Sequence, residues 1–318
     1  MSQLLKRNIY YKYKWLPKGG IILDSIIVCN TAEDTLSKIE LENYSVKNLP
    51  LYLGEKPVGP HGAIIYDNKI VTANNYNNTI SIIDAIGFNE LKSIYVGAHP
   101  NDVRIFNDKA YVSCGDSDSI LVIDIKEEKI LFDIMSDKTP HSLELDNENG
   151  ILYVSNMDGN TISVIDCSLN KVIRTIKAPE YPIKILLSKD KRMLYICESY
   201  LGQEVEGYIT LVSTENYNTI GRIKVGLAPV DLWNEEDNLY VTNFTEGSIS
   251  IIDLKRYREI KKIYVGGMPR GIVKKNQILF VGDYISGKVK AINIKEKTIK
   301  NIAVGKEPNA ILLIENHH

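Results

Sequence analysis

Five side chains that could bind a charged ligand or transfer protons occupy two positions of a motif that recurs along this sequence of 318 residues. His61, His141 and Arg270 each follow a proline directly, where two other copies of the motif carry isoleucine or valine and two carry asparagine. Glu198 and Asp283 end short apolar runs where other copies end in asparagine. Imidazoles and carboxylates can transfer protons, and a guanidinium offers a fixed fork of donors that suits a carboxylate or phosphate. The set is therefore suited to holding an acidic ligand or to acid–base chemistry.

The candidate ligand-binding residues include the asparagines that end the other apolar runs. The full set is His61, Asn74, His141, Asn156, Glu198, Asn243, Arg270 and Asp283. We expect these side chains to converge on one rim, where Glu198 and Asp283 could hold Arg270 in place when no ligand is bound. Because the asparagines recur with the motif, their alternative role is to bond the backbone where a strand meets a turn. For the two histidines, the alternative is a solvated surface position.

A catalytic site is the second hypothesis for these residues. In a hydrolase or lyase, a histidine or glutamate would act as general base or acid, and Arg270 would stabilise a developing oxyanion. A divalent metal would use His61, His99, His141 and Glu198. Each of these four lies in a different copy of the motif, however, and the sequence has no HExxH or HxH pattern. We therefore predict no metal site, and we assign no catalytic residue and no cofactor from the sequence.

The elements that must position these side chains follow from an internal repeat. An acidic or polar residue closes one strand in each copy, at Glu40, Asp84, Asp124, Asp166, Ser213, Asp253 and Asn293. Ten residues earlier, the preceding strand ends at Asn30, Asn74, Cys114, Asn156, Asn243 and Asp283. In the fifth copy the equivalent residue is Glu198, fifteen before Ser213, and the five extra residues fall within YLGQEVEGY.

Turns such as VGAHP, VGLAP and VGGMP mark where each unit begins, and a short apolar strand follows each proline. With the two strands just described and one more leading to the next turn, every unit has four strands. Four short strands in about 40 residues, repeated seven times, are typical of a β-propeller. The sequence predicts an all-β, seven-bladed propeller of four-stranded antiparallel blades, forming a single domain over residues 1–318.

The repeat also carries a family resemblance. LYVTN (239–243), LYVSN (152–156) and AYVSC (110–114) are each followed by a run such as SISIID, TISVID or SILVID. These motifs resemble the YVTN repeat family of bacterial propellers, which is similar in turn to the seven-bladed lactonase-like and surface-layer-type propellers. The resemblance covers almost the whole chain. It implies the fold, and it leaves binding proteins, lactonases and lyases all open as functions.

The two ends of the chain must close the ring, because an unpaired sheet edge is a liability. Both GIIL near residues 20–23 and AILL near residues 310–313 fit the innermost-strand pattern, and residues 8–14 resemble an outermost strand. We predict that the C-terminal strand completes the first blade by pairing with the N-terminal segment. Residues 1–20 are then an N-terminal extension or an outer strand.

Composition narrows the function classes. The formal net charge is −2, from 38 basic and 40 acidic residues, so nothing in the charge favours a nucleic-acid partner. No apolar run is long enough to span a membrane, and no signal-peptide pattern is present, so we expect a soluble, cytoplasmic monomer. Cys29, Cys114, Cys167 and Cys197 form no CxxC pair and are expected to be free, buried thiols.

The absence of a catalytic motif favours a non-catalytic binding or scaffolding propeller, which uses its channel mouth or rim loops to bind a protein or small-molecule partner. A lactonase-like hydrolase or lyase at the channel mouth, with or without a divalent metal, is the alternative.

Overall fold

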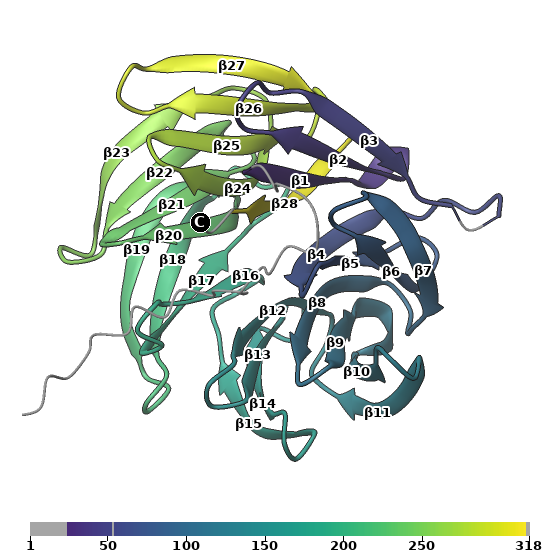
Figure 1. Cartoon of the computed structure of the whole chain (residues 1–318). Helices are drawn as coiled ribbons and strands as arrows, with labels where there is room; N and C mark the ends of the chain where they lie inside the picture. Colours follow the sequence, from purple (N-terminus) through teal and green to yellow (C-terminus); the bar gives the residue numbers. More distant parts are fainter. Residues whose placement is uncertain (1–23, 53, 316–318) are drawn as a thin grey trace, which may run out of the picture.

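Seven four-stranded antiparallel sheets form a ring in the computed structural model, which describes residues 24–52 and 54–315 (Figure 1). Blade 1 has the strand order β28-β1-β2-β3, and blades 2 to 7 take β4–β7, β8–β11, β12–β15, β16–β19, β20–β23 and β24–β27 in turn. Two short 3-10 helices, η1 (Thr31–Glu33) and η2 (Gly115–Ser117), follow second strands in this part of the chain. The predicted all-β propeller of seven blades is confirmed.

The innermost strand of every blade begins at the proline of the repeated turn. Proline has no N–H to give to a sheet ladder, so it is tolerated at the first residue of a strand. These strands are β4 (Pro60–Tyr66), β8 (Pro100–Phe106), β12 (Pro140–Asp146), β16 (Pro182–Leu187), β20 (Pro229–Glu235), β24 (Pro269–Lys275) and β28 (Pro308–Ile314).

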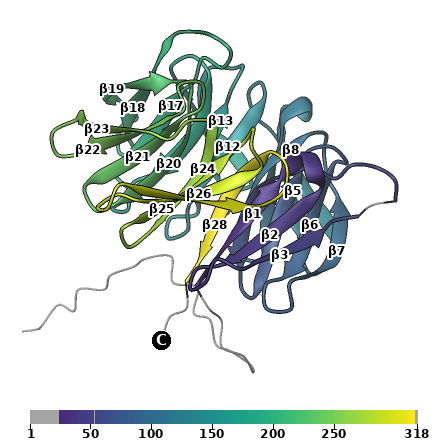
Figure 2. The ribbon, with the colours of Figure 1, turned by 90° about the horizontal axis from the view of Figure 1, so that it is seen from above.

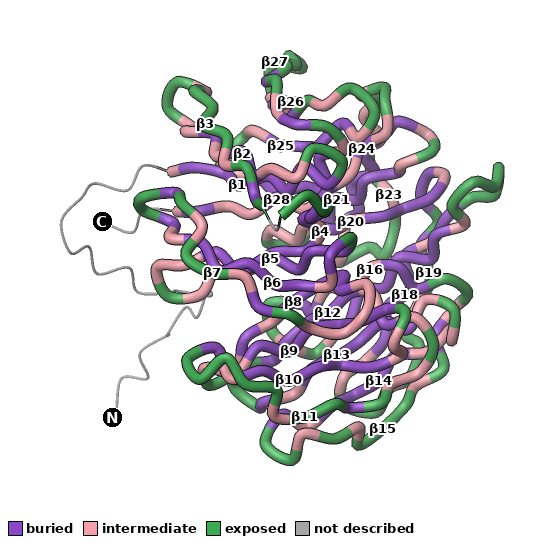
Figure 3. The backbone as a smooth tube through the Cα atoms, turned by 90° about the vertical axis from the view of Figure 1, so that its right-hand side faces the viewer, coloured by how far each residue is buried: buried purple, intermediate pink, exposed green. Residues whose placement is uncertain are grey.

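The second and third strands of each blade are β-branched runs that are buried almost throughout, as Figure 3 shows for the interior of the ring. The second strands end at the predicted residues: β1 (Ser25–Asn30), β5 (Lys69–Asn74), β9 (Lys109–Cys114), β13 (Ile151–Asn156), β17 (Met193–Glu198), β21 (Asn238–Asn243) and β25 (Ile278–Asp283). The third strands close at the acidic or polar anchors: β2 (Thr35–Glu40), β6 (Thr79–Asp84), β10 (Ser119–Asp124), β14 (Thr161–Asp166), β18 (Glu206–Ser213), β22 (Ser248–Asp253) and β26 (Lys288–Asn293).

The fourth strands form the outer edges and are largely exposed to solvent (Figure 3). They are β3 (Val46–Pro50), β7 (Asn89–Tyr95), β11 (Lys129–Met135), β15 (Lys171–Lys177), β19 (Thr219–Leu227), β23 (Arg258–Tyr264) and β27 (Thr298–Ala303). Lysines and other charged residues recur along them, which discourages pairing with another chain.

The hydrophobic core is divided among the junctions between blades. Each of its clusters draws on two neighbouring sheets, as when Val71 and Ile80 of blade 2 pack with Val103 and Val112 of blade 3. One such cluster fills every junction around the ring, so each blade is stabilised by both of its neighbours. All four cysteines are free and buried, as expected from the sequence.

The ring is closed by the two ends of the described chain. β28 lies beside β1 (Figure 2), in an antiparallel register that matches Ser25 with Ile314 and Val28 with Ile311. The C-terminal strand therefore completes blade 1 as predicted. The other candidates for closure, residues 8–14 and 20–23, lie outside the described residues, as does the predicted extension over residues 1–20.

Candidate functional site

Five polar side chains surround the entrance of the central channel. Each directly follows the first proline of an innermost strand, so the five project from equivalent points of different blades. They are His61, Asn101, His141, Arg270 and Asn309, and we call them the mouth layer. They line a cavity of about 200 Å³ that continues down the channel between the inner strands. Three of the predicted ligand-binding residues, His61, His141 and Arg270, are therefore brought together.

The two histidines of the mouth layer are held in the same tautomer. Nδ1 of His61 lies 2.9 Å from the carbonyl oxygen of Asn101, and Nδ1 of His141 lies 2.8 Å from that of Ile183. A carbonyl can only accept, so Nδ1 carries the proton in both rings and Nε2 carries a lone pair when the ring is neutral. The rings meet edge to face with centroids 5.5 Å apart.

Arg270 stands beside these rings without a carboxylate partner in the described part of the chain. Its Nε donates to Oδ1 of Asn309 at 2.7 Å, and its Nη2 lies 3.3 Å from Nε2 of His61. Its guanidinium carbon lies 5.7 Å from the ring centre of Tyr284. The guanidinium is thus fixed by neutral groups, and its positive charge is left without a paired negative charge.

The electrostatics of the mouth layer keep both imidazoles neutral. These side chains are half-buried in the channel, and burial disfavours the charged form of histidine. Burial, then the charge of Arg270, lower the pKa of His141 to about 4. Burial, Arg270 and His141 hold the pKa of His61 well below 6.5. Burial also lowers the pKa of Arg270, although a guanidinium stays protonated.

Deeper in the channel lies a second group of charged side chains, which sequence reasoning missed. Asp102, Arg104, Glu144, Lys184 and Asp231 project from β8, β12, β16 and β20, and we call them the belt. The signal that could have found them is the charge within otherwise apolar inner strands, as in DVRI and SLEL.

The charges of the belt are paired with one another and with the backbone. Arg104 lies 2.7 Å from Asp102 and 3.6 Å from Glu144, and Lys184 lies 3.3 Å from Asp231. The two aspartates also bridge blades, because Asp102 accepts from the amide of Leu143 at 3.0 Å and Asp231 from that of Ile272 at 3.2 Å. Burial alone would lower the pKa of Lys184, but the nearby carboxylates more than offset it and raise that pKa.

The predicted asparagines do not reach the cavity. Each is buried within its blade, where Nδ2 donates to two hydroxyls of the next strand. Asn74 donates to Thr79 and Ser81 at 2.9 Å, and we call such a pair of hydrogen bonds a clamp. The same clamp joins Asn156 to Thr161 and Ser163, and Asn243 to Ser248 and Ser250. The expected backbone bond occurs at Asn243, whose Oδ1 accepts from the amide of Gly226 at 3.2 Å. The principal partners are nevertheless side chains, because the hydroxyls repeat with the asparagine.

Glu198 replaces this clamp in blade 5. The carboxylate is fully buried and receives Nε of Arg222 at 2.9 and 3.0 Å, together with the hydroxyl of Thr210. The guanidinium of Arg222 stacks over Tyr208, 3.6 Å from the ring centre. The expectation that Glu198 supports Arg270 is wrong, because its charge is already compensated within its own blade.

Asp283 is similarly engaged within blade 7. Its carboxylate accepts from Lys290 at 2.9 Å, from Ser286 at 2.7 Å and from the amide of Met268 at 3.1 Å. Burial alone would raise the pKa of Asp283, but these bonds more than offset it and the pKa lies below its ordinary value. Asp283 therefore does not hold Arg270 either; Asn309 and His61 do.

The donor set for a metal is not assembled in the described residues. His99 lies in the turn before β8 and does not line the cavity, and Glu198 is paired with Arg222. No group of three or more histidine, cysteine, aspartate or glutamate side chains suited to a metal occurs in this part of the chain. His61 and His141 both face the channel beside the guanidinium of Arg270, and its positive charge would repel a metal cation.

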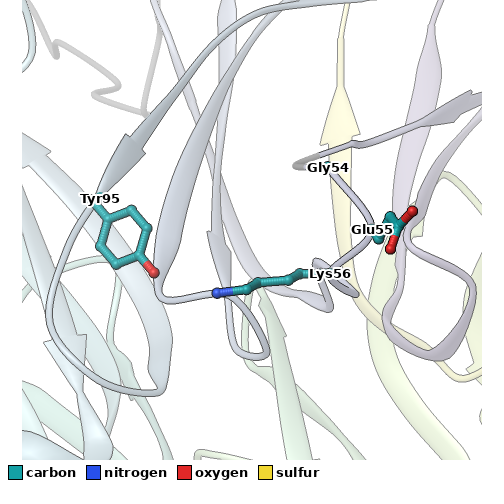
Figure 4. Close-up of a pocket in the computed structure, with 4 residues that line it drawn as sticks. All are labelled: Gly54, Glu55, Lys56 and Tyr95. Atoms are coloured by element: carbon teal, nitrogen blue, oxygen red, sulfur yellow. The ribbon is translucent and has the colours of Figure 1, made fainter.

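A larger hollow of about 630 Å³ lies on the outside of the ring, between the β3–β4 connection and the end of β7 (Figure 4). In Figure 4, Lys56 extends towards Tyr95 and Glu55 points away from it. These side chains and Gly54 are all exposed to solvent. A small-molecule site needs convergent polar groups in a partly enclosed space, so the channel is the stronger candidate despite its smaller volume.

Comparisons with known proteins support the fold. No family model matches the chain, and no curated protein matches it either. Among solved structures, it is similar to hydrazine synthase of Kuenenia stuttgartiensis, with a TM-score of 0.71 and 14% identity over 83% of this chain and 97% of that one. A protein of unknown function from Desulfotomaculum acetoxidans has a TM-score of 0.74 and 13% identity, covering 91% of this chain and 98% of that one.

The dihydro-heme d1 dehydrogenase NirN, solved in complex with DHE, is a third similar structure. The TM-score is 0.67 at 12% identity, and the likeness covers 89% of this chain and 64% of NirN. At such identities the likenesses show the propeller fold alone, so the function must be argued from the site. No helix in the described residues is long and apolar enough to cross a membrane.

Proposed function

We propose that this protein is a non-catalytic binding propeller whose mouth layer holds a small anionic ligand. The observation that carries the proposal is the guanidinium of Arg270, which is fixed by Asn309 and His61 and has no carboxylate partner among the described residues. A buried charge is normally paired. An anion entering the cavity would supply the missing charge, and the fixed donor fork suits a carboxylate or a phosphate.

A catalytic role has less support from the same geometry. A general base works best when its pKa lies near the operating pH. Burial and Arg270 lower the pKa of His141 to about 4, and His61 already uses Nε2 to accept from Arg270. Glu198, the carboxylate that was a candidate for acid–base work, is committed to Arg222. Binding is therefore favoured over a hydrolase or lyase.

The proposal also covers the family, the cellular location, the oligomeric state and the partner of the protein. The repeated LYVTN and SISIID motifs support a place among YVTN-type propellers. A cytoplasmic monomer, with a protein partner that offers an acidic side chain to the mouth layer, is consistent with the sequence. A free small molecule is the primary hypothesis because the cavity, at about 200 Å³, is small and enclosed by inner strands.

The test uses the fluorescence of Trp233, a residue that lines the same cavity. The other tryptophan, Trp15, lies outside the described residues and would be changed to phenylalanine in every sample. Acetate and inorganic phosphate are the probes. Arg270→Gln should weaken anion binding by about 1.5 to 3 kcal/mol, or roughly 10- to 150-fold, because a hydrogen-bonded charge is lost.

Arg256→Gln is the matched control, since it removes the same charge from a side chain that is 66% exposed at the outer turn before β23. It should bind the probes as the parent protein does. Binding that survives Arg270→Gln unchanged, or an absence of binding by the parent protein, would reject the proposed site.

A further inference from the structure

The mouth layer offers an acceptor as well as donors. Because Nδ1 of His141 donates to the carbonyl of Ile183, Nε2 presents a lone pair. No residue in the described part of the chain donates a hydrogen bond to that atom, and the ring lines the cavity. His61, the other imidazole, differs because its Nε2 lies against Nη2 of Arg270. A ligand that meets only the donors of Arg270 would leave the acceptor of His141 without a partner.

The donors beside this acceptor belong to Arg270. A guanidinium has five N–H groups, and Arg270 directs Nε to Asn309 and one Nη2 hydrogen to His61. Its other N–H groups form no hydrogen bond to the described residues, so they can receive a carboxylate. The site therefore presents one cationic donor group and one neutral acceptor on the same side of the channel mouth.

The size of the cavity limits the ligand. Its volume of about 200 Å³ lies below the roughly 300 to 1,000 Å³ that is typical of sites for drug-sized ligands. Acids of two to four carbon atoms are therefore the ligands that best match the cavity.

We infer that the ligand is a small hydroxycarboxylate, whose carboxylate binds Arg270 and whose hydroxyl donates to Nε2 of His141. This inference rests on the proposed function and specifies the ligand for the same site. A hydroxyl is favoured over an ammonium because the cavity already holds the positive charge of Arg270. The carboxylates below it, Asp102, Glu144 and Asp231, are engaged by Arg104 and Lys184.

The experiment compares matched acids by Trp233 fluorescence in the Trp15→Phe background. Glycolate and L-lactate carry the hydroxyl, and acetate and propionate lack it. The hydroxy acids should bind roughly tenfold more tightly, because an unpaired buried acceptor is costly. His141→Phe should remove this preference while acetate still binds. His99→Phe removes an imidazole outside the cavity and should leave the preference unchanged.

A second measurement needs no variant at His141 and so does not depend on how that variant folds. The ¹⁵N chemical shift of Nε2 of His141 should move when L-lactate binds, because its lone pair becomes hydrogen-bonded, and should stay near its free value with propionate. A shift that does not respond to L-lactate would overturn the inference.

The outcomes separate the two proposals. Equal affinities for glycolate and acetate, both lost in Arg270→Gln, would overturn the hydroxycarboxylate inference and leave the anion site standing. L-alanine binding as tightly as L-lactate would also overturn it, because an ammonium would then serve as well as a hydroxyl. If none of these acids binds the parent protein, the proposed function fails and the inference fails with it.

Discussion

The mouth layer and the belt occupy the same channel, yet they handle charge in opposite ways. In the belt, Arg104 and Lys184 lie against Asp102 and Asp231. In the mouth layer, Arg270 is supported by a neutral amide and a neutral imidazole. Both groups consist of polar residues on inner strands, so position alone does not distinguish them.

The difference shows that charge compensation, rather than location, identifies the better candidate for binding. Both aspartates of the belt also accept backbone amides from the next blade, which links β8 to β12 and β20 to β24. The belt therefore acts between blades and contributes to stability. The mouth layer keeps its charge unpaired at some cost, as expected of a site that is completed by a ligand.

The largest effect should come from removing the strand that holds both layers in a closed ring. Deleting residues 308–318 takes away β28, which leaves the inner edge of β1 unpaired and exposes the clusters that contain Ile311 and Ile314. We expect loss of cooperative thermal unfolding, measured by circular dichroism. A truncated protein that melts like the full chain would show that blade 1 does not need this strand.

A single change in the belt should be the next largest. Asp231→Ala leaves Lys184 and the amide of Ile272 without their partner, so the free energy of unfolding should fall by about 3 kcal/mol. Asp231→Asn should lose less, because an amide oxygen can still accept from Ile272. Urea unfolding measures both. An unchanged free energy of unfolding in Asp231→Ala would show that the belt does not stabilise the protein more than the mouth layer does.

Acid should destabilise the protein through the mouth layer. The pKa of His141 is about 4 when folded and about 6.5 when unfolded, so the unfolded chain binds more protons between these values. Stability is therefore fully present above about pH 6.5 and falls as the pH approaches about 4, by roughly 1 to 3 kcal/mol. Urea unfolding against pH in chloride solution measures the slope. His141→Phe should make it shallower; an identical slope would assign the effect to other groups.

The smallest expected effect on the free energy of unfolding comes from Arg270, and it should not be destabilising, unlike the loss of Asp231. Arg270→Met keeps a long apolar stem and removes a desolvated charge that has no carboxylate partner among the described residues. The free energy of unfolding should stay constant or rise by up to about 1 kcal/mol. Thermal unfolding without added anions is the measurement. A loss as large as that of Asp231→Ala would mean that Arg270 is structural.

The fold was predictable from the sequence because its signal is repeated. The ends of the second and third strands were placed correctly in every blade, including Glu198, since alternating β-branched runs and turn residues recur together. The pairing of β28 with β1 followed from the need to cover an edge.

The site was predictable only in part. His61, His141 and Arg270 follow prolines at equivalent points and therefore meet. Residues at the ends of second strands face into their own blades, and the partners that neutralise Glu198 and Asp283 lie 24 and 7 residues further along, at Arg222 and Lys290. Charge pairing across strands sets their role, and a repeat alignment does not reveal it.

The clamps at the ends of the second strands have a consequence for how seven similar hairpins find their correct partners. Asn243 faces two serines, Asp283 faces Lys290, and Glu198 is matched by Arg222 and Thr210. A hybrid blade that joined β25 to β22 would place the carboxylate of Asp283 opposite the hydroxyls of Ser248 and Ser250, in place of its own partner Lys290. Blade 3 shows the cost of a partial match, because Cys114 stands in place of asparagine and the hydroxyl of Ser119 is left buried without a partner in the described structure. We therefore expect the clamps, which differ from blade to blade, to disfavour exchange of strands between neighbouring repeats.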